Sequence, residues 1–302
     1  MNAKRIVAGL SRRLYAYMYS LYWSSVSVLY SWKIMWPNAS AAQAEEVGRQ
    51  EKASRKIFVM MHSGRLTDLY IKCFETARRH SPDSKIEFFT DLTEEERMKL
   101  KPYAVTFHDI RTKDYLRKSV VLKIEILRSL DFKYGDNVIV SDLDIVFQSD
   151  PFKVFKNDFD VFFTTRHYRY HFLINGGIWG FRVNERSRRF VRFFIRQMFA
   201  RSWQSLREFG KRFGRDHYGP GWFLDQDFLC TVYENINSLP RKIMDVRFFD
   251  AGYRYNFCPS FDINGENAVQ ELKSKIGDPD YVVLHLKAQL KRILDVSELK
   301  KL

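Results

Sequence analysis

Short apolar runs alternate with segments of helical apolar spacing between residues 56 and 164 of this chain. The runs predict strands and the spacing predicts helices, with strands at 56–61, 86–90, 105–108, 138–147 and 160–164 and helices at 66–79 and 117–130. This alternation is typical of an α/β fold with a largely parallel sheet. Ligands of such sheets bind at the carboxyl ends of the strands. We therefore expect the functional site at that edge.

The predicted strand 138–147 carries two aspartates within an otherwise apolar run. Side chains two positions apart on a strand share a face, so Asp142 and Asp144 are expected to project together. Two ionised carboxylates repel each other and resist burial unless a cation or hydrogen-bond donors compensate. A hard divalent cation such as Mn²⁺ or Mg²⁺ suits this arrangement and keeps positions open for substrate phosphates. The alternative is that these aspartates cap a following turn, since Asp150-Pro151 lies just beyond.

Composition narrows the range of partners. The 302 residues carry a net charge of +14, which favours a membrane surface, a phosphorylated substrate or nucleic acid. Nucleic acid is not expected, because no helix-turn-helix, zinc-finger or RNA-recognition signature accompanies the charge. The three cysteines have neither metal-ligand spacing nor the pattern of a disulfide framework.

The first 54 residues differ from the rest of the chain. Four basic residues precede an uncharged run at 14–32 that is rich in Tyr, Trp and Ser. The run is long enough to span a bilayer as a signal anchor, but Trp and Tyr prefer the headgroup level. An interfacial or docked helix and a cleaved signal peptide are the alternatives. We expect a membrane-associating helix and linker at 1–54 and a folded domain at 55–302, with the cytoplasmic face and a Golgi-type lumen both open.

A second basic region follows Arg182. Asn184 is the expected N-cap of a helix at 185–200, whose apolar face includes Phe190 and Phe194 while arginines crowd the other side. This pattern fits either a solvated helix face or a surface that contacts a membrane or an anionic substrate.

A glycine-rich stretch follows the predicted strand at 160–164. Asn175, Gly176 and Gly177 open a segment with three glycines in five residues. Glycine lets the backbone approach a ligand closely, which is the functional interpretation. Asn-Gly is also an ordinary hairpin turn, which is the structural one.

Two more stretches carry candidate chemistry. Asp225 and Gln226 lie near the start of another predicted helix, where the helix dipole favours an acidic residue, or where a carboxylate beside Trp222 can meet a sugar. A short apolar strand ends in His285 and Lys287, with Lys291 beyond. These residues form either an ordinary strand end or a corner that attracts phosphate.

Taken in order, these motifs resemble GT-A type nucleotide-sugar glycosyltransferases, and among them the nucleotide-diphospho-sugar transferase group that includes glycosyltransferase family 77. The resemblance covers residues 55–291, with Gly176 in place of the usual Ala and Ala288 in place of Gly. The matching motifs are a helix with Lys123, then Asp142-Leu143-Asp144 with Asp150-Pro151, Asn175-Gly176-Gly177 leading to Phe181-Arg182, Asp225-Gln226, and His285 through Lys291.

The resemblance implies an α/β catalytic domain of GT-A (Rossmann-like) type at 55–302, with a mixed, mostly parallel sheet flanked by helices. It implies transfer of a sugar from a nucleotide-diphosphate donor, UDP-linked, to a glycan or glycoconjugate acceptor with retention at the anomeric carbon. A Mn²⁺ (or Mg²⁺) ion would stabilise the departing diphosphate as a Lewis acid. The residues expected by resemblance are Asp142, Asp144 and His285 as metal ligands, Lys123, Asp142, Gly176, Gly177, Lys287 and Lys291 at the donor, and Asn175, Asp225 and Gln226 around the reacting sugar.

Two other functions start from the same residues. Haloacid-dehalogenase-type phosphatases also place an Asp-x-Asp motif after an apolar strand, with Asp142 then the nucleophile. Their motif usually lies near the start of the domain, whereas here a long strand-helix pattern precedes it. A membrane-bound interaction protein without catalysis is the second alternative, because a fold does not imply an activity.

Overall fold

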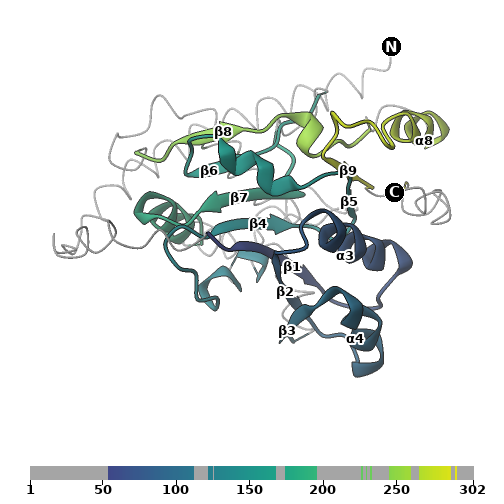
Figure 1. Ribbon diagram of the computed structural model, residues 1–302, viewed down its shortest axis with the longest axis horizontal. Helices are drawn as coiled ribbons and strands as arrows, with labels where there is room; N and C mark the ends of the chain where they lie inside the picture. Colours follow the sequence, from purple (N-terminus) through teal and green to yellow (C-terminus); the bar gives the residue numbers. More distant parts are fainter. Residues whose placement is uncertain are drawn as a thin grey trace, which may run out of the picture. The chain divides into compact units, whose positions relative to one another are not determined.

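The computed structural model describes residues 54–111, 122–124, 126–167, 174–195, 226, 229, 232, 245–259, 265–286 and 290. Nearly all of these belong to one compact unit, formed by residues 51–230 and 246–302 (Figure 1). The predicted N-terminal helix lies outside the described residues, and the predicted boundary at residue 55 stays a prediction. Among the described residues, no helix has the length and apolar character that crossing a bilayer requires.

Four parallel strands form one half of a seven-stranded sheet, in the order β3-β2-β1-β4. Their bounds are β1 Lys56–His62, β2 Lys85–Thr90, β3 Val105–Asp109 and β4 Asn137–Ser141. The connections between them contain α3 (Asp68–His80), α4 (Glu94–Leu100) and the short 3-10 turns η2 (Lys101–Tyr103) and η3 (Ile126–Arg128). Strands β2 and β3 lie on one side of β1 and β4 lies on the other, so the strand order reverses between β1 and β4. Open α/β sheets bind ligands at such a switch point.

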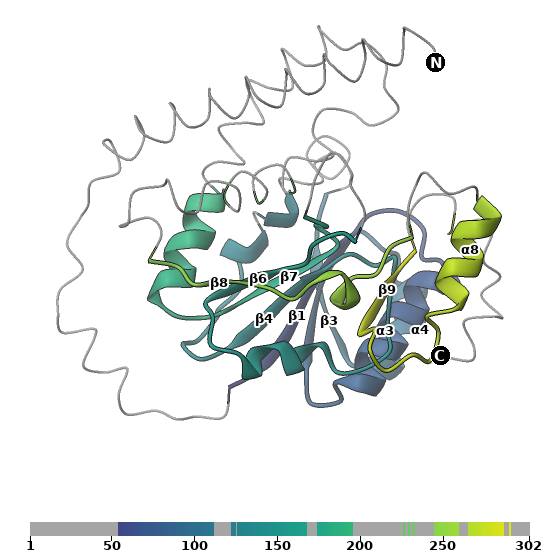
Figure 2. The same ribbon diagram turned by 90° about the horizontal axis from the view of Figure 1, so that it is seen from above.

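The other half of the sheet is mixed. Strand β7 (Ile178–Arg182) is antiparallel to β4 and to β6 (Val161–Phe163), and β8 (Phe248–Asp250) runs parallel to β6. A separate two-stranded sheet pairs β5 (Ile145–Phe147) with β9 (Val283–His285) in antiparallel register. The remaining elements are η4 (Pro151–Lys156), η5 (Tyr253–Tyr255) and α8 (Gly265–Lys273), the last of which lies beyond β9 in the view from above (Figure 2).

Local sequence explains the helix boundaries. Thr67 caps α3 through a hydrogen bond that its side chain accepts from the Tyr70 amide, and basic residues occupy the last turn. Helix α4 begins with a capping box between Thr93 and Glu96. Asn184 caps the helix after β7, as predicted, because its Oδ1 accepts from the Ser187 amide at 2.9 Å. These caps satisfy amide donors that have no partner inside a helix.

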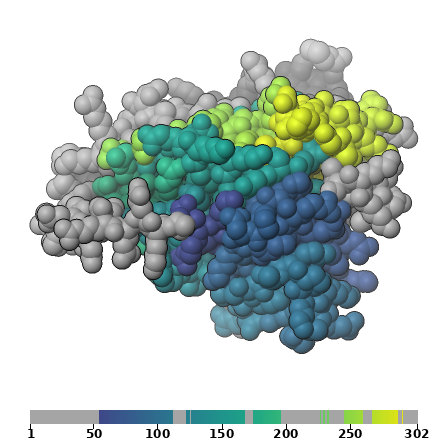
Figure 3. All heavy atoms as spheres, viewed as in Figure 1, coloured from purple at the N-terminus to yellow at the C-terminus, as the bar shows by residue number. Residues whose placement is uncertain are grey.

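Aromatic side chains dominate the core. Phe58 on β1 is fully buried and its ring centroid lies 5.2 Å from that of Phe147 and 4.8 Å from that of Phe152. Each such ring contributes about 1.5–3 kcal/mol to folding by burial alone. A second apolar cluster joins Leu69 of α3 to Val269 of α8. On the outside of the protein, the blue and yellow parts of the chain lie next to each other in the space-filling view (Figure 3).

The predicted α/β architecture is confirmed, with one correction. The stretch 138–147 is not a single strand, since β4 ends at Ser141 and β5 begins at Ile145 in a different sheet. The chain bends between them, so Asp142 and Asp144 lie in a connection rather than on one face of a strand. Much of the helix predicted at 117–130 lies outside the described residues.

Candidate active site

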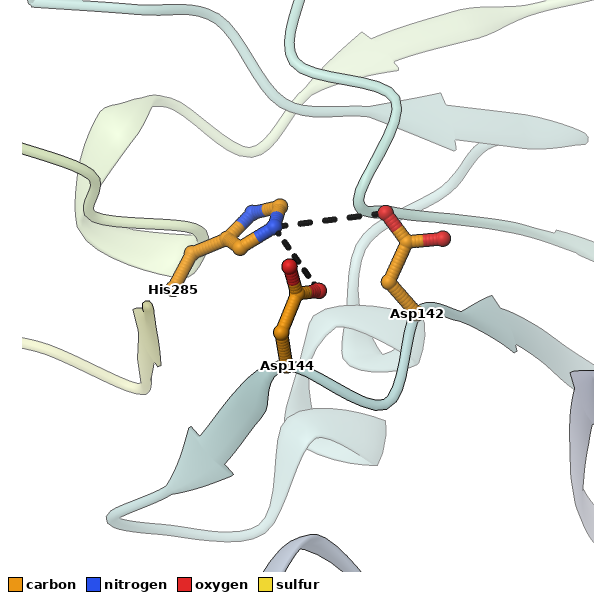
Figure 4. A group of neighbouring side chains, drawn as sticks. All are labelled: Asp142, Asp144 and His285. Atoms are coloured by element: carbon orange, nitrogen blue, oxygen red, sulfur yellow. Dashed lines mark ion pairs between the residues drawn. The ribbon is translucent and has the colours of Figure 1, made fainter. Parts of the chain in front are cut away.

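Asp142, Asp144 and His285 come together beyond the carboxyl end of β4 (Figure 4). The His285 Nε2 atom lies 3.2 Å from Asp144 Oδ1 and 3.9 Å from Asp142 Oδ2. Backbone pairing sets this geometry, because Ile145 of β5 is the register partner of His285 and the Leu286 amide donates to the Asp144 carbonyl at 2.7 Å. The predicted grouping of these three residues is therefore present.

These three side chains fit a divalent cation. One ligand atom from each lies within 4.8 Å of the others, a spread that is compatible with ligands of one ion. The set contains one imidazole and two carboxylates, and the carboxylates are the ligand type that suits Mn²⁺ or Mg²⁺. The imidazole is fully buried, while the side chain of Asp142 is 36% exposed. A cation at this point would compensate two carboxylates and still be reachable by a substrate.

Lys123 lies in a described helical fragment at 122–124, and its ammonium contacts Asp142 of this cluster. Its Nζ donates to Asp142 Oδ1 at 2.5 Å and to the Gly176 carbonyl at 3.2 Å. It therefore holds one oxygen of Asp142 while the other oxygen faces His285. The ammonium ties the aspartate to the glycine-rich loop, and its predicted contact with a donor diphosphate stays a prediction.

The glycine-rich loop packs directly against the histidine. A Cβ atom added to Gly177 would lie closer than 3.0 Å to two atoms of the His285 ring and 3.1 Å from its Nε2. The Gly177 carbonyl accepts from the Asp142 amide at 2.8 Å. Glycine is thus required here to make room for an imidazole, a reason that the sequence does not contain. The predicted contacts of Gly176 and Gly177 with a donor stay predictions.

Asn175 is buried within a polar network next to the site. Its amide NH2 donates to the Asn256 carbonyl at 3.2 Å, and its own carbonyl accepts from Thr164 Oγ1 at 3.0 Å. Asn256 also reaches His285 Nδ1, at 2.9 Å. Sequence reasoning missed Asn256 and Thr164, because neither belongs to a motif and only chain packing brings them to the histidine.

Gln226 is buried and accepts a hydrogen bond through its Oε1 from Arg166 Nη2 at 3.0 Å. Arg166 follows β6 and is itself buried, which places a guanidinium at the carboxyl edge of the sheet. Sequence reasoning missed this arginine. Asp225, Lys287 and Lys291 lie outside the described residues, so their roles stay predictions.

Cys73 of α3 is fully buried and its Sγ lies 4.0 Å from the Asp142 carbonyl oxygen. Burial, together with the charges of Asp144 and Asp142, raises the pKa of this thiol well above its ordinary value. Cys73 therefore stays protonated at neutral pH. Because the thiolate is the form that binds metals, Cys73 is not expected to act as a ligand.

Comparison with known proteins supports the interpretation of these motifs. A family model described as nucleotide-diphospho-sugar transferase matches residues 82–291, which is more than half of the chain. A search of curated proteins gave no match.

Several solved structures resemble the chain at 12% sequence identity. Galactosyltransferase LgtC in complex with donor and acceptor sugar analogues gives a TM-score of 0.49 over 81% of this chain and 94% of that chain. Mouse xyloside xylosyltransferase 1 in its apo form gives 0.47 over 76% and 97%. A glycosyltransferase involved in glycosylation of the major capsid of PBCV-1 gives 0.46 over 82% and 98%.

Likeness at these scores carries no argument about activity. The family match is independent of these structures, and it covers Asp142, Asp144, the glycine-rich loop and His285. The chain therefore belongs to the nucleotide-diphospho-sugar transferases, a family of GT-A glycosyltransferases.

Proposed function

We propose that this protein transfers a sugar from a nucleotide-diphosphate donor, UDP-linked, to a glycan or glycoconjugate acceptor in a metal-dependent reaction with retention at the anomeric carbon. The observation that carries the proposal is the convergence of Asp142, Asp144 and His285 within 4.8 Å, in a chain of this family. With the family established, the phosphatase alternative is set aside.

Three residues of the site would bind a cation, and Lys123 connects one of them to the glycine-rich loop. Asp142, Asp144 and the Nε2 atom of His285 would bind Mn²⁺ or Mg²⁺. When bound, the ion supplies Lewis-acid stabilisation to the departing diphosphate. Lys123 keeps Asp142 oriented and adds a positive charge near the leaving group, where preorganised charge is most effective.

The reacting sugar would lie between this cluster and the catalytic candidates. Asp225 is proposed as the carboxylate on the reacting face, where it either stabilises an oxocarbenium-like state or positions the acceptor hydroxyl. Gln226 and Asn175 are proposed to contact the sugar. Arg166 supports this role of Gln226, because its guanidinium donates to Gln226 Oε1 and so restrains the orientation of the side-chain amide. Lys287 and Lys291 are proposed to bind the diphosphate.

The experiment that tests the proposal is a screen of nucleotide sugars for Mn²⁺-dependent hydrolysis without acceptor. Titration calorimetry with Mn²⁺ and a panel of nucleoside diphosphates accompanies it. We expect one donor to be hydrolysed and its nucleoside diphosphate to bind only when Mn²⁺ is present. Absence of metal-dependent binding across the panel would refute the transferase proposal and favour a non-catalytic interaction protein.

We also propose that residues 14–36 attach the protein to a membrane surface, on the strength of their aromatic composition and the basic residues before them. Flotation with anionic vesicles tests this with the full chain. Replacing Trp23 and Leu29 by Glu should release the protein from the vesicles. Unchanged flotation of that variant would refute the proposal. The cytoplasmic face and a Golgi-type lumen are both compatible with it.

A further inference from the structure

Asn256 lies directly behind the imidazole of His285, on the side away from the carboxylates. Backbone hydrogen bonds hold the two residues in register, because the Phe257 amide donates to the Val283 carbonyl at 2.9 Å and the His285 amide donates to the Phe257 carbonyl at 2.8 Å. Asn256 is 2% exposed and His285 is fully buried. Water therefore has little access to the contact between their side chains.

The orientation of the Asn256 amide follows from its neighbours. Its Nδ2 lies 3.2 Å from the Asn175 carbonyl, which only accepts hydrogen bonds, and 3.0 Å from Thr164 Oγ1. The NH2 end of the amide must therefore point towards Asn175 and Thr164. Its Oδ1 is left to face His285 Nδ1 at 2.9 Å.

An amide oxygen only accepts, so the hydrogen of this contact belongs to Nδ1 of His285. A neutral imidazole that carries its proton on Nδ1 presents a lone pair at Nε2. The Nε2 atom is the one that faces Asp144 and Asp142. In metal sites, a partner on the second nitrogen fixes the tautomer and the ring orientation of a ligating histidine in this way.

We propose that Asn256 is a positioning residue that holds His285 in the tautomer and orientation needed to bind the metal ion, and that it couples this ligand to Asn175. The inference rests on the proposed metal-dependent function. The coupling follows from the shared contacts, since Asn256 bonds to Asn175 in both directions. A displacement of His285 would therefore be transmitted to the loop that is proposed to contact the sugar.

The test compares two substitutions that share the branching and the number of side-chain heavy atoms of Asn. Asn256→Leu and Asn256→Asp both remove the NH2 group, but only Asp keeps an oxygen that can accept from His285 Nδ1. Mn²⁺ affinity is measured by calorimetry without nucleotide, with the melting temperature recorded alongside. We expect Asn256→Leu to weaken Mn²⁺ binding about 10- to 100-fold and Asn256→Asp to stay near wild type, although both lose thermal stability.

Asn184→Leu is the matched control. It removes a part-buried amide contact with Asp160 and a helix cap at the opposite edge of the sheet. It should lower the melting temperature without changing Mn²⁺ affinity. Equal Mn²⁺ affinities of Asn256→Leu and Asn256→Asp would overturn the positioning role. Failure of the unaltered protein to bind Mn²⁺ would instead overturn the proposed function.

A measurement on the unaltered protein keeps the inference falsifiable if Asn256→Leu does not fold. With ¹¹³Cd²⁺ in place of Mn²⁺, ¹⁵N NMR reports which imidazole nitrogen binds the ion. We expect coupling from cadmium to His285 Nε2 and a slowly exchanging proton on Nδ1. Coupling to Nδ1, or a proton on Nε2, would overturn the inference.

Discussion

Substitution of Gly177 by Ala tests whether loop packing controls the metal site. The added Cβ would lie closer than 3.0 Å to two ring atoms of His285, whereas ordinary contacts begin at 3.4 Å. The ring must therefore move by more than about 0.4 Å, which exceeds the tolerance of about 0.2 Å for a metal–ligand distance. Asn256 and β9 restrain the ring from behind, so the strain cannot be relieved without cost.

We expect Gly177→Ala to weaken Mn²⁺ binding at least about 10-fold, because a displaced histidine is lost as a ligand. The overpacking should also lower the free energy of unfolding by about 1–3 kcal/mol. Calorimetric titration with Mn²⁺ measures the first effect and urea unfolding followed by circular dichroism measures the second.

Gly180→Ala is the matched control for this experiment. Its Cβ would collide with the Val138 carbonyl inside the main sheet rather than with His285. This variant should lose stability and keep Mn²⁺ affinity in its folded fraction. A folded Gly177→Ala protein that binds Mn²⁺ as tightly as wild type would refute the reasoning.

Two further predictions concern the metal site, and a third concerns the ion pairs of Asp160. Asp144→Asn should abolish Mn²⁺-dependent donor hydrolysis and leave the circular dichroism spectrum unchanged, and retained hydrolysis would contradict the metal role. Lys123→Met should lower donor hydrolysis by about 100-fold, because it removes the charge that orients Asp142, and unchanged turnover would argue against this role. Burial raises the pKa of Asp160, whereas hydrogen bonds from Arg247 and Asn184 lower it, and the net result is a pKa below the ordinary 3.8. The ionised Asp160 therefore stabilises the fold above about pH 4, and this stabilisation is lost as the pH falls through the lowered pKa. Urea unfolding at several pH values should therefore show a flatter acid limb for Asp160→Asn than for wild type, and equal limbs would contradict the assignment.

The strands of the parallel half and its first helix, α3, were predictable because each depends on a local pattern. Strand β1 was predicted at 56–61 and spans Lys56–His62, and α3 was predicted at 66–79 and spans Asp68–His80. A short apolar run indicates a strand buried in a sheet, and this pattern does not depend on residues far away in the chain. Helix α4 was not predicted, since its seven residues have only Leu100 buried and give little periodicity.

The pairing of Asp142 with Asp144 was predicted correctly for an incorrect reason. We expected them on one face of a continuous strand, but they lie in the bend between β4 and β5. The apolar run that continues to Phe147 concealed the change of sheet, because both strands are buried. The spacing of the two aspartates therefore predicted that they lie close together, but it did not predict the path of the backbone between the two strands.

The alternating architecture, the positive charge and the ordered motifs of the family could all be recognised from the amino-acid sequence. Those properties depend on residue types and short spacings, which a chain carries before it folds. The folded protein was needed to show that β9 pairs with β5, that Gly177 makes room for His285, and that Asn256 contacts the imidazole. These contacts join residues far apart in the chain, so their geometry depends on strand pairing and side-chain packing that no local pattern encodes.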